Sequence, residues 1–443
     1  MNTLCDVIEE AASKRSSQVA LRKRRGDFSS GMKKGTEPYS LRDITFAEVR
    51  DFAVRNAFVL RERKGIQTGE HVGIIAENTP ETFLARLGTQ FAGAVDVSFD
   101  YDLVPHRTNK GNLDALRKQI RDTQPNLLLV QDHLVERVRG STDIPILPIS
   151  GYGASLAKMA QDASSGLAAP VQIDPAAPSM MIGSSGTTSD SDLDFKFALH
   201  TQGSLLGNIR DLGQVLPIHA GQIYMSGLAK SSHVFEASVQ IAMLYYGVVQ
   251  HFTDRGAYLL GEGPFIKPDF GLMVPLMANK TKNQAERAIA GIGAPGPIIR
   301  RKVAGKLGPN KVFLIGGSAP LEETTQRWWM DTAKMPIFQG YGLTEYPIVS
   351  VNLPEEGYRI KSSGRLLPGI EAMIVDRESL NPITEFDKEG ILCLRGPGTF
   401  VGYHNRPNQT AEALPQEGPL RSWLNTGDLV KLDSDGFLYV TGR

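Results

Sequence analysis

Short apolar runs alternate with helical patterns along most of the chain, and this alternation limits the folds open to it. His71–Asn78 is an apolar run that ends in polar turn residues, and Thr79-Pro80 then opens a helical pattern. Two more apolar runs follow at 94–100 and 126–132, with a helical pattern between them. Strands that alternate with helices favour an α/β fold with a mostly parallel sheet covered on both faces.

The alternation recurs and then gives way to a different pattern. Strand and helix signals return at 221–253 and at 311–333, which predicts a second helix-covered sheet. From about Gly364 the strands are short and separated by Gly, Asp and Pro, with a hairpin signal at Asp433–Gly436. A chain of 443 residues is too long to fold around a single compact core. We therefore predict three parts, two α/β parts at 1–180 and 181–350 and a small antiparallel barrel or sheet at 351–443.

Charge and cysteine content narrow the class of protein. Lys plus Arg and Asp plus Glu both number 48, so no net charge steers the chain toward nucleic acid or an anionic membrane. Cys5 and Cys393 are too few for a disulfide framework or a zinc site. No run approaches the roughly 20 apolar residues of a membrane span, and none has the form of a signal peptide. We predict a cytoplasmic protein without a membrane span or a nucleic-acid partner.

A loop rich in glycine and hydroxyl groups has the chemistry of a phosphate cradle. Glycines allow backbone N–H groups to approach an anion, and hydroxyls add further donors. A turn without a ligand is the alternative, because such loops are common. The candidate phosphate contacts are Ser184, Ser185, Gly186, Thr187 and Thr188.

A second element, Phe338–Pro347, follows the strand signal "MPIFQ". Ligands of parallel sheets bind beyond the carboxyl ends of the strands. Tyr341 can stack on a base, Thr344 can donate to a phosphate, and Glu345 can hold Mg²⁺, which prefers carboxylate, water and phosphate oxygens. Asp428, after Thr426-Gly427, can accept both hydroxyls of a ribose, although a plain turn residue before a strand is the alternative.

Five short motifs, taken in their order, give a specific match. "SSGTT", "GGSAPL", "QGYGLTE", "TGD" and "TGR" resemble the adenylate-forming superfamily, which includes acyl-CoA synthetases, peptide-synthetase adenylation domains and beetle luciferases. "SSHVFEASVQIAMLYYG" and "GPGTFVGYHNRPNQTAEAL" are closest in style to long-chain acyl-CoA synthetases. The resemblance implies the large N-terminal domain of such an enzyme. It also implies a ligase that activates a carboxylic acid as an acyl-adenylate and passes the acyl group to CoA, with ATP or acyl-AMP, Mg²⁺ and CoA as cofactors.

The resemblance also implies a role for single residues. The loop at Ser184–Thr188 would hold the β- and γ-phosphates, with Lys196 as the loop lysine. Thr344 and Glu345 would contact phosphate and Mg²⁺, and His233 and Tyr346 would line the acyl pocket, although a core histidine is an equal alternative for His233. The residues implied around adenine and ribose are Ser318, Ala319, Pro320, Gly340, Tyr341, Gly342, Asp428 and Arg443.

In the family, the arginine of the last motif stands just before the hinge to a small C-terminal domain, which carries a further lysine. This sequence ends at Gly442-Arg443. We therefore expect a fragment that binds an acyl-adenylate and turns over poorly by itself.

The phosphate loop departs from the family pattern Gly-Thr-Thr-Gly-x-Pro-Lys. The glycine after Thr188 is Ser189, the proline is absent, and three carboxylates stand before the loop lysine, namely Asp190, Asp192 and Asp194. Two like charges about 4 Å apart repel by about 1 kcal/mol in water and about 4 kcal/mol at an effective dielectric constant of about 20. We expect impaired adenylation, so that the enzyme takes a preformed acyl-AMP, supplied by a separate adenylating ligase, and transfers it to CoA.

Other interpretations remain open at this point. If the three acids point into solvent, the chain is an ordinary ATP-dependent ligase for medium- or long-chain fatty acids, with CoA or an acyl-carrier protein as acceptor. A non-catalytic adenylate-binding protein and a luciferase-like oxidative enzyme are further alternatives. Leu276, Ala278 and Asn279 replace the family's arginine, aromatic and acid, which predicts a wider acyl pocket. Such features resemble ligases of platensimycin-type antibiotic biosynthesis.

Overall fold

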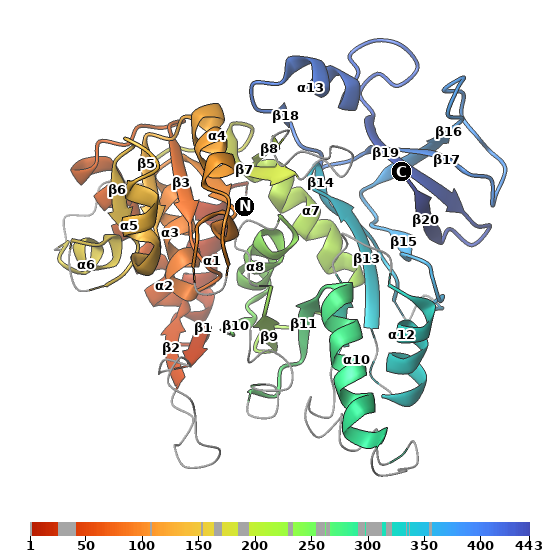
Figure 1. Ribbon diagram of the computed structural model, residues 1–443, viewed down its shortest axis with the longest axis horizontal. Helices are drawn as coiled ribbons and strands as arrows, with labels where there is room; N and C mark the ends of the chain where they lie inside the picture. Colours follow the sequence, from red (N-terminus) through yellow and green to blue (C-terminus); the bar gives the residue numbers. More distant parts are fainter. Residues whose placement is uncertain are drawn as a thin grey trace.

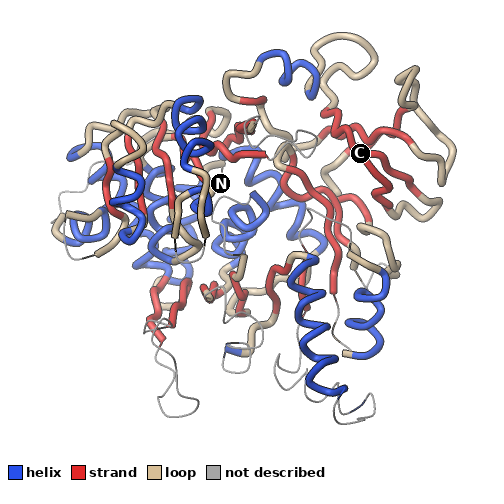
Figure 2. Tube along the Cα trace, in the orientation of Figure 1, coloured by secondary structure: helices blue, strands red, loops and turns tan. Residues whose placement is uncertain are grey.

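The part of the chain that the structure describes folds into three β-sheets with helices packed on them (Figures 1 and 2). The computed structural model describes residues 2–24, 41–106, 109–151, 154–163, 171–184, 195–228, 234–253, 262, 266–290, 297, 312–315, 321–333, 335, 337–353 and 357–443. The predicted α/β class is confirmed, with parallel pairs at the centre of both large sheets. Antiparallel pairs stand at both edges of the second sheet and at the β18 edge of the first, whereas the β6 edge is parallel.

The first sheet has seven strands in the order β18-β8-β7-β4-β3-β5-β6. Its parallel centre is formed by the apolar runs that the sequence pattern predicted as strands. The strands are β3 (His71–Ile75), β4 (Val95–Phe99), β5 (Leu127–Val130), β6 (Ile146–Pro148), β7 (Pro178–Ser184), β8 (Lys196–Thr201) and β18 (Gly402–Tyr403).

The second sheet has nine strands in the order β15-β14-β13-β12-β11-β9-β10-β1-β2. The strands are β1 (Val19–Arg24), β2 (Leu41–Thr45), β9 (Ile223–Ser226), β10 (Val249–Phe252), β11 (Phe270–Met273), β12 (Val312–Ile315), β13 (Ile337–Leu343), β14 (Tyr346–Val351) and β15 (Arg365–Leu366). Strands from the first and last parts of the chain thus join sheets built mainly by other parts, so the predicted division at 180 and 350 stays a prediction.

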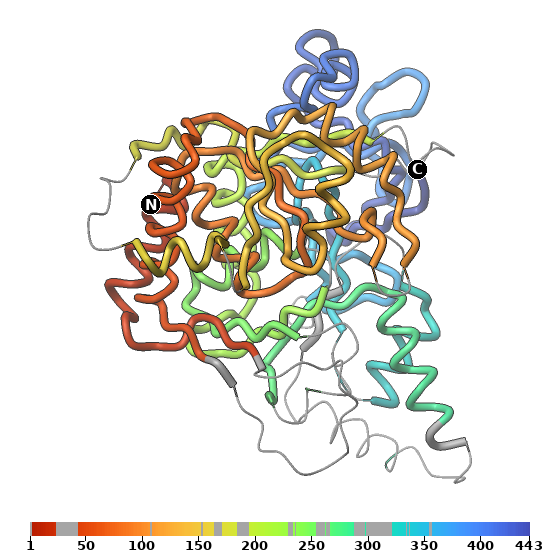
Figure 3. Tube along the Cα trace, turned by 60° about the vertical axis from the view of Figure 1, so that its left-hand side comes forward, coloured from red at the N-terminus to blue at the C-terminus, as the bar shows by residue number. Residues whose placement is uncertain are grey.

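The third sheet is small and antiparallel, with strand order β16-β17-β19-β20. It comprises β16 (Glu371–Val375), β17 (Gly390–Arg395), β19 (Leu424–Leu432) and β20 (Leu438–Gly442). The hairpin predicted at Asp433–Gly436 joins β19 to β20. Within the described residues this is an open sheet, and it lies far from the N-terminal helix in both views (Figures 1 and 3).

A layer of helices separates the two large sheets. Helix α3 contacts β1 of the second sheet and β3 and β4 of the first, and α7 contacts β7, β8 and β14. This inner layer comprises α1 (Leu4–Arg15), α2 (Phe46–Phe58), α3 (Pro80–Phe91), α6 (Leu156–Gln161), α7 (Gln202–Val215) and α8 (Val234–Tyr246). The outer faces carry α4 (Leu113–Thr123) and α5 (Val135–Arg139) on the first sheet, α10 (Pro275–Ala290) and α12 (Glu323–Arg327) on the second, and α13 (Pro407–Ala413) follows β18. Single 3₁₀ or π turns lie at Val59–Arg63, Tyr101–Leu103, Asp132–Leu134 and Trp328–Thr332.

The inner layer is tight where α2 crosses α3. A Cβ atom at Gly88 would lie 2.3 Å from the Cβ of Asn56, so only glycine allows this approach. Asn56 also donates to the Leu84 carbonyl oxygen at 3.0 Å. Helix α3 begins at Pro80, as the sequence predicted. Thr79 caps this helix and Pro80 occupies its first turn. In the part of the chain that the structure describes, no helix is long and apolar enough to cross a membrane.

An ion pair is buried between α3 and β4. Arg86 Nε lies 2.7 Å from Asp96 Oδ2, and Arg86 Nη2 donates to the Ser98 hydroxyl at 2.7 Å. Both charged side chains are buried. Burial raises the pKa of Asp96, against the lowering by Arg86 and Ser98.

We predict that Arg86→Met lowers the free energy of unfolding by about 3–5 kcal/mol, because the Asp96 carboxylate would stay buried without its cation. The matched control is Arg22→Met, which breaks the exposed pair with Asp43 and should cost less than about 1 kcal/mol. Urea unfolding of both variants measures the difference. Equal destabilisation by the two substitutions would contradict the prediction.

Candidate active site

Strand β13 carries the predicted nucleotide strip Gly340-Tyr341-Gly342. Its first half, Ile337–Gln339, pairs in parallel with β12, and its second half pairs antiparallel with β14. The expectation that the strand ends at Gln339 was therefore wrong, because β14 turns back and supplies new backbone partners. A Cβ at Gly342 would lie 2.0 Å from the Pro347 carbonyl oxygen, so the two strands meet backbone to backbone there.

Tyr341 and Asp428 join the second sheet to the third. The Tyr341 hydroxyl donates to Asp428 Oδ2 at 2.6 Å, and Arg443 Nε lies 3.0 Å from the other oxygen, Oδ1. Burial and the neighbouring Asp428 carboxylate hold the pKa of Tyr341 well above its usual value, so the phenol stays a donor. Asp428 lies within β19 and not in a turn before a strand. Three of the predicted residues thus form one cluster, although 87 positions separate Tyr341 from Asp428, and their role toward a nucleotide stays a prediction.

The turn Thr344–Glu345 joins β13 to β14 and is held from the first sheet. The His200 ring on β8 contacts the Thr344 carbonyl oxygen through Nε2 at 2.7 Å. The Phe400 backbone N–H donates to the Glu345 carbonyl oxygen at 2.9 Å. The Tyr403 hydroxyl on β18 donates to Glu345 Oε1 at 2.5 Å. Sequence reasoning missed all three of these partners, since none lies in a motif with a chemistry of its own.

His200 is a neutral donor in this position. Its side chain is fully buried, and burial lowers its pKa to about 4, against the raising effect of the Thr344 carbonyl. Because a carbonyl oxygen only accepts, Nε2 must carry the proton that the ring retains. Protonation of Nδ1 as well would place a charge where no hydrogen-bond partner stands among the described residues.

Lys196 and Ser184 close the phosphate loop at its base. They pair across β7 and β8, and the loop between them, 185–194, lies outside the described residues. The Lys196 ammonium lies 5.3 Å from the centroid of the Tyr403 ring. The strand pairing therefore brings the loop lysine to the tyrosine that holds Glu345.

Other predicted site residues are only partly placed. Tyr346 is fully buried, and its ring lies against Gly396 and Gly398. Its role in an acyl pocket stays a prediction, as does that of His233. The predicted residues outside the described ranges are Ser185, Gly186, Thr187, Thr188, His233, Ser318, Ala319 and Pro320, and Ser184 is described only in its backbone.

The wider acyl pocket expected beside His233 stays a prediction, because His233 lies outside the described residues. Ala278 is fully buried in the apolar cluster that holds Trp328 and Trp329, and Trp329 donates to its carbonyl oxygen at 3.3 Å. A zero exposed fraction leaves no room for a water molecule beside its methyl group.

Glu345 fits the expected Mg²⁺. Within the described ranges, no group of three or more His, Cys, Asp or Glu side chains is arranged to hold a metal ion. Mg²⁺ bound with a nucleotide uses one or two carboxylates and takes its other ligands from phosphates and water. One oxygen of Glu345 accepts from Tyr403, which leaves Oε2 for such a metal.

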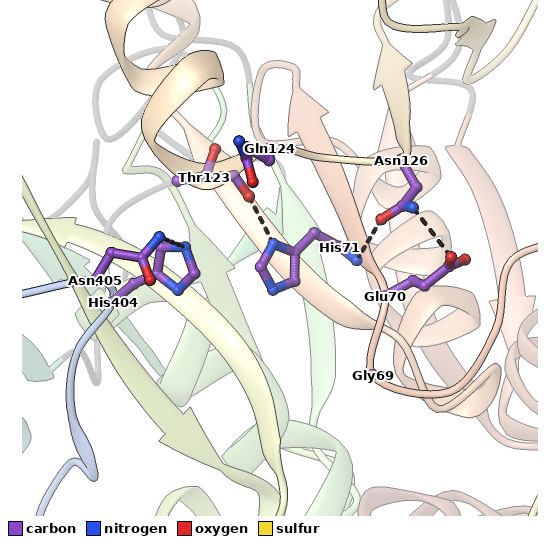
Figure 4. A pocket seen from close by; sticks show the side chains of 8 residues that line it. All are labelled: Gly69, Glu70, His71, Thr123, Gln124, Asn126, His404 and Asn405. Carbon is purple, nitrogen blue, oxygen red and sulfur yellow. Dashed lines mark hydrogen bonds between the residues drawn. The ribbon is translucent and has the colours of Figure 1, made fainter.

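A separate cavity lies behind β18 (Figure 4). Its lining includes His71 and His404, whose ring centroids are 5.2 Å apart, together with Glu70 and Asn126. His404, the residue after β18, lines this cavity, whereas the Tyr403 hydroxyl donates to Glu345. The cavity contains none of the predicted site residues.

Comparison with known proteins assigns the family. The model of the AMP-binding enzyme family matches residues 8–404. The chain therefore belongs to the AMP-binding enzyme family, and its fold is that of the N-terminal part of adenylate-forming enzymes.

Relatives match over different lengths. A long-chain-fatty-acid–CoA ligase of Mus musculus is 39% identical over 127 residues, which are 29% of this chain and 16% of that protein. A 3-hydroxybenzoate–CoA/4-hydroxybenzoate–CoA ligase of Thauera aromatica is 26% identical over 417 residues, covering 91% of this chain and 72% of that protein. The match to the mouse ligase thus spans a small part of that relative's length.

Solved structures share the fold. ATP-bound MatB from Rhodopseudomonas palustris aligns with a TM-score of 0.79 at 21% identity, over 99% of this chain and 78% of that chain. The N-terminal domain of FACL13 from Mycobacterium tuberculosis aligns with a TM-score of 0.78 at 19% identity, with both chains covered in full.

The neutral state of His200 predicts an acid-sensitive stability. Because folding lowers its pKa from about 6.5 to about 4, its contribution is fully present above pH ~6.5 and is lost as the pH falls toward 4. As the pH falls over that range, the free energy of unfolding of the wild-type protein should decrease by about 3 kcal/mol more than that of His200→Gln. Unfolding free energies from pH 7 to 4 measure this, with the exposed His219→Gln as control. Parallel pH curves for wild type and His200→Gln would contradict it.

Proposed function

We propose that the protein is an acyl-CoA ligase, which activates a carboxylic acid as an acyl-adenylate and transfers the acyl group to CoA. The observation that carries the proposal is the cluster of Tyr341, Asp428 and Arg443 next to the turn Thr344–Glu345. The cluster offers a carboxylate to the ribose hydroxyls, and the turn offers a hydroxyl and a carboxylate to phosphate and Mg²⁺. The names of the mouse and Thauera relatives, both CoA ligases, support the reaction class.

Each residue of the candidate site is assigned a role in this reaction. Asp428 accepts from the ribose hydroxyls, and Arg443 holds that carboxylate in place. Thr344 donates to the α-phosphate, and Lys196 stabilises the leaving phosphates. Glu345 would hold Mg²⁺, which supplies charge neutralisation at the phosphate oxygens when it is bound. The loop Ser184–Thr188 and the segment Ser318–Pro320 are proposed to hold the phosphates and to border the adenine.

We further propose that the second half-reaction dominates. Asp190, Asp192 and Asp194 put negative charge in the loop that would stabilise the leaving pyrophosphate, and such stabilisation is the main contribution of phosphate loops to catalysis. Acyl-AMP needs only the adenine, ribose and α-phosphate contacts. The enzyme would then take its acyl-adenylate from a separate adenylating ligase, in the cytoplasm, where ATP and CoA are both supplied. Antibiotic biosynthesis is the proposed setting for such a division of labour.

An ordinary ATP-dependent fatty acyl-CoA ligase is the second candidate. It is favoured by the relatives that match best over short segments, since a long-chain-fatty-acid–CoA ligase of Escherichia coli O157:H7 is also 36% identical over 129 residues. In this case the three carboxylates of the loop point into solvent. Acyl-carrier protein in place of CoA is the corresponding alternative acceptor.

Two assays on the full protein separate these candidates. The first is acid-dependent ATP–pyrophosphate exchange, and the second is formation of acyl-CoA from synthetic acyl-AMP and CoA. Transfer without exchange supports the dominant second half-reaction. Exchange together with transfer supports the ordinary ligase. If neither occurs with a panel of fatty and aromatic acids, the proposed ligase activity is wrong.

The loop carboxylates give a quantitative prediction. Removing three charges near the phosphates should raise the exchange rate about tenfold or more, because each repulsion of about 1 kcal/mol corresponds to about a fivefold change. The variant is the triple substitution Asp190→Asn, Asp192→Asn and Asp194→Asn, assayed for both half-reactions. Transfer from acyl-AMP should stay within about twofold. An unchanged exchange rate would show that these acids do not face the nucleotide.

A further inference from the structure

Tyr403 contacts both charged groups that the proposed function assigns to the phosphates. Its hydroxyl donates to Glu345 Oε1 at 2.5 Å, and the Lys196 ammonium lies 5.3 Å from the centroid of its ring. Glu345 comes from the second sheet, and Lys196 begins β8 of the first. One side chain thus links an anion and a cation that lie on different sheets.

The backbone around Tyr403 is fixed on both sides. Tyr403 pairs with Ala198 of β8, and its own N–H donates to the Thr410 hydroxyl at 2.9 Å. Gly402 has a φ of +141°, and a Cβ there would lie 2.8 Å from Thr410. A larger residue at 402 would therefore displace the strand. The Phe400 ring packs edge-on against the Tyr403 ring with centroids 4.9 Å apart, so the ring has one place to lie.

Among the described residues, the Tyr403 hydroxyl has a single hydrogen-bond acceptor, the Glu345 carboxylate. A protonated phenol donates one hydrogen bond, and here that bond points at one oxygen of a buried carboxylate. The other oxygen is thereby oriented in a single direction.

We propose that Tyr403 is a positioning residue, whose hydroxyl orients the Glu345 carboxylate and whose ring orients the Lys196 ammonium toward the phosphates of a bound nucleotide. The inference rests on the proposed function for the identity of the ligand. Tyr403 lies in the stretch 396–414, which resembles long-chain acyl-CoA synthetases, but no role was assigned to it from the sequence. Residues that orient a metal-binding carboxylate typically change metal affinity by 10- to about 100-fold when they are removed.

Tyr403→Phe tests the hydroxyl alone. ATP affinity is measured across a series of Mg²⁺ concentrations, and AMP affinity is measured in the same preparations. The Mg²⁺ concentration that gives half of the full gain in ATP affinity should rise about tenfold, while AMP affinity stays within about twofold, because AMP depends on Tyr341 and Asp428. Equal weakening of AMP and ATP would mean a merely structural role and would overturn the inference.

Tyr403→Leu tests the ring. Loss of the aromatic ring beneath Lys196 should lower the affinity for ATP at saturating Mg²⁺ by a further three- to about fivefold relative to Tyr403→Phe. The matched control is Tyr439→Phe, which also removes a phenol donating to a carboxylate, Asp433 at 3.3 Å, away from the candidate site. The control should leave both nucleotide affinities unchanged.

A cycle of unfolding measurements keeps the inference testable if the protein proves not to bind nucleotides. Tyr403→Phe and Glu345→Gln are combined, and the unfolding equilibrium constants of the four proteins are compared. If the two residues are coupled, the unfolding equilibrium constant of the double variant should differ by about tenfold from the value expected when the two single effects are independent. Additive effects would overturn the Tyr403–Glu345 contact. Absence of AMP binding by the wild-type protein would instead overturn the proposed function.

Discussion

The turn between β13 and β14 depends on hydrogen bonds from outside its own sheet. Its two carbonyl oxygens accept from the His200 ring and the Phe400 backbone, and the Glu345 side chain accepts from Tyr403. All three donors belong to the first sheet or to the segment that leads into its edge strand. Without them, Thr344 and Glu345 would sit on a free hairpin, with no fixed relation to Lys196. The relative placement of the two large sheets therefore determines the geometry of the candidate site.

Burial gives these contacts their strength. His200 stays neutral and Tyr403 stays protonated because the interior disfavours their charged forms. The Tyr341 phenol is held in the same way beside Asp428. Neutral donors around buried carboxylates orient those carboxylates without adding a competing charge. Positive charge near these carboxylates comes from Arg443, which pairs with Asp428, and from Lys196, which lies over the Tyr403 ring.

Much of the fold could be predicted from the sequence. The apolar runs at 71–75 and 127–130 form strands because their length and flanking turn residues admit little else, and Thr79-Pro80 starts α3 for a local reason. The continuation of β13 through Gly340–Leu343 could not be predicted, because it depends on antiparallel pairing with β14. Likewise, β18 joins the first sheet from the far end of the sequence, a pairing that no local pattern encodes.

The residues of the candidate site likewise fall into those that the sequence predicted and those that only the tertiary structure reveals. Tyr341, Asp428 and Arg443 were found because each lies in a motif that resembles a known family, and the structure brings them together. His200 lies in a strand of ordinary composition, and Tyr403 lies in a stretch that resembles the family without a role assigned to it. Only their tertiary contacts reveal them.

We propose that a nucleotide binds where the three sheets meet, beside Tyr341, Glu345 and Asp428. Amide hydrogen exchange with and without AMP tests it most directly, because the rates report each segment separately. We predict slower exchange on AMP binding at 340–345 and at 426–443, with no change at 69–71, 123–126 and 404–405. Slower exchange only around the His71–His404 cavity, with 340–345 unaffected, would contradict the account.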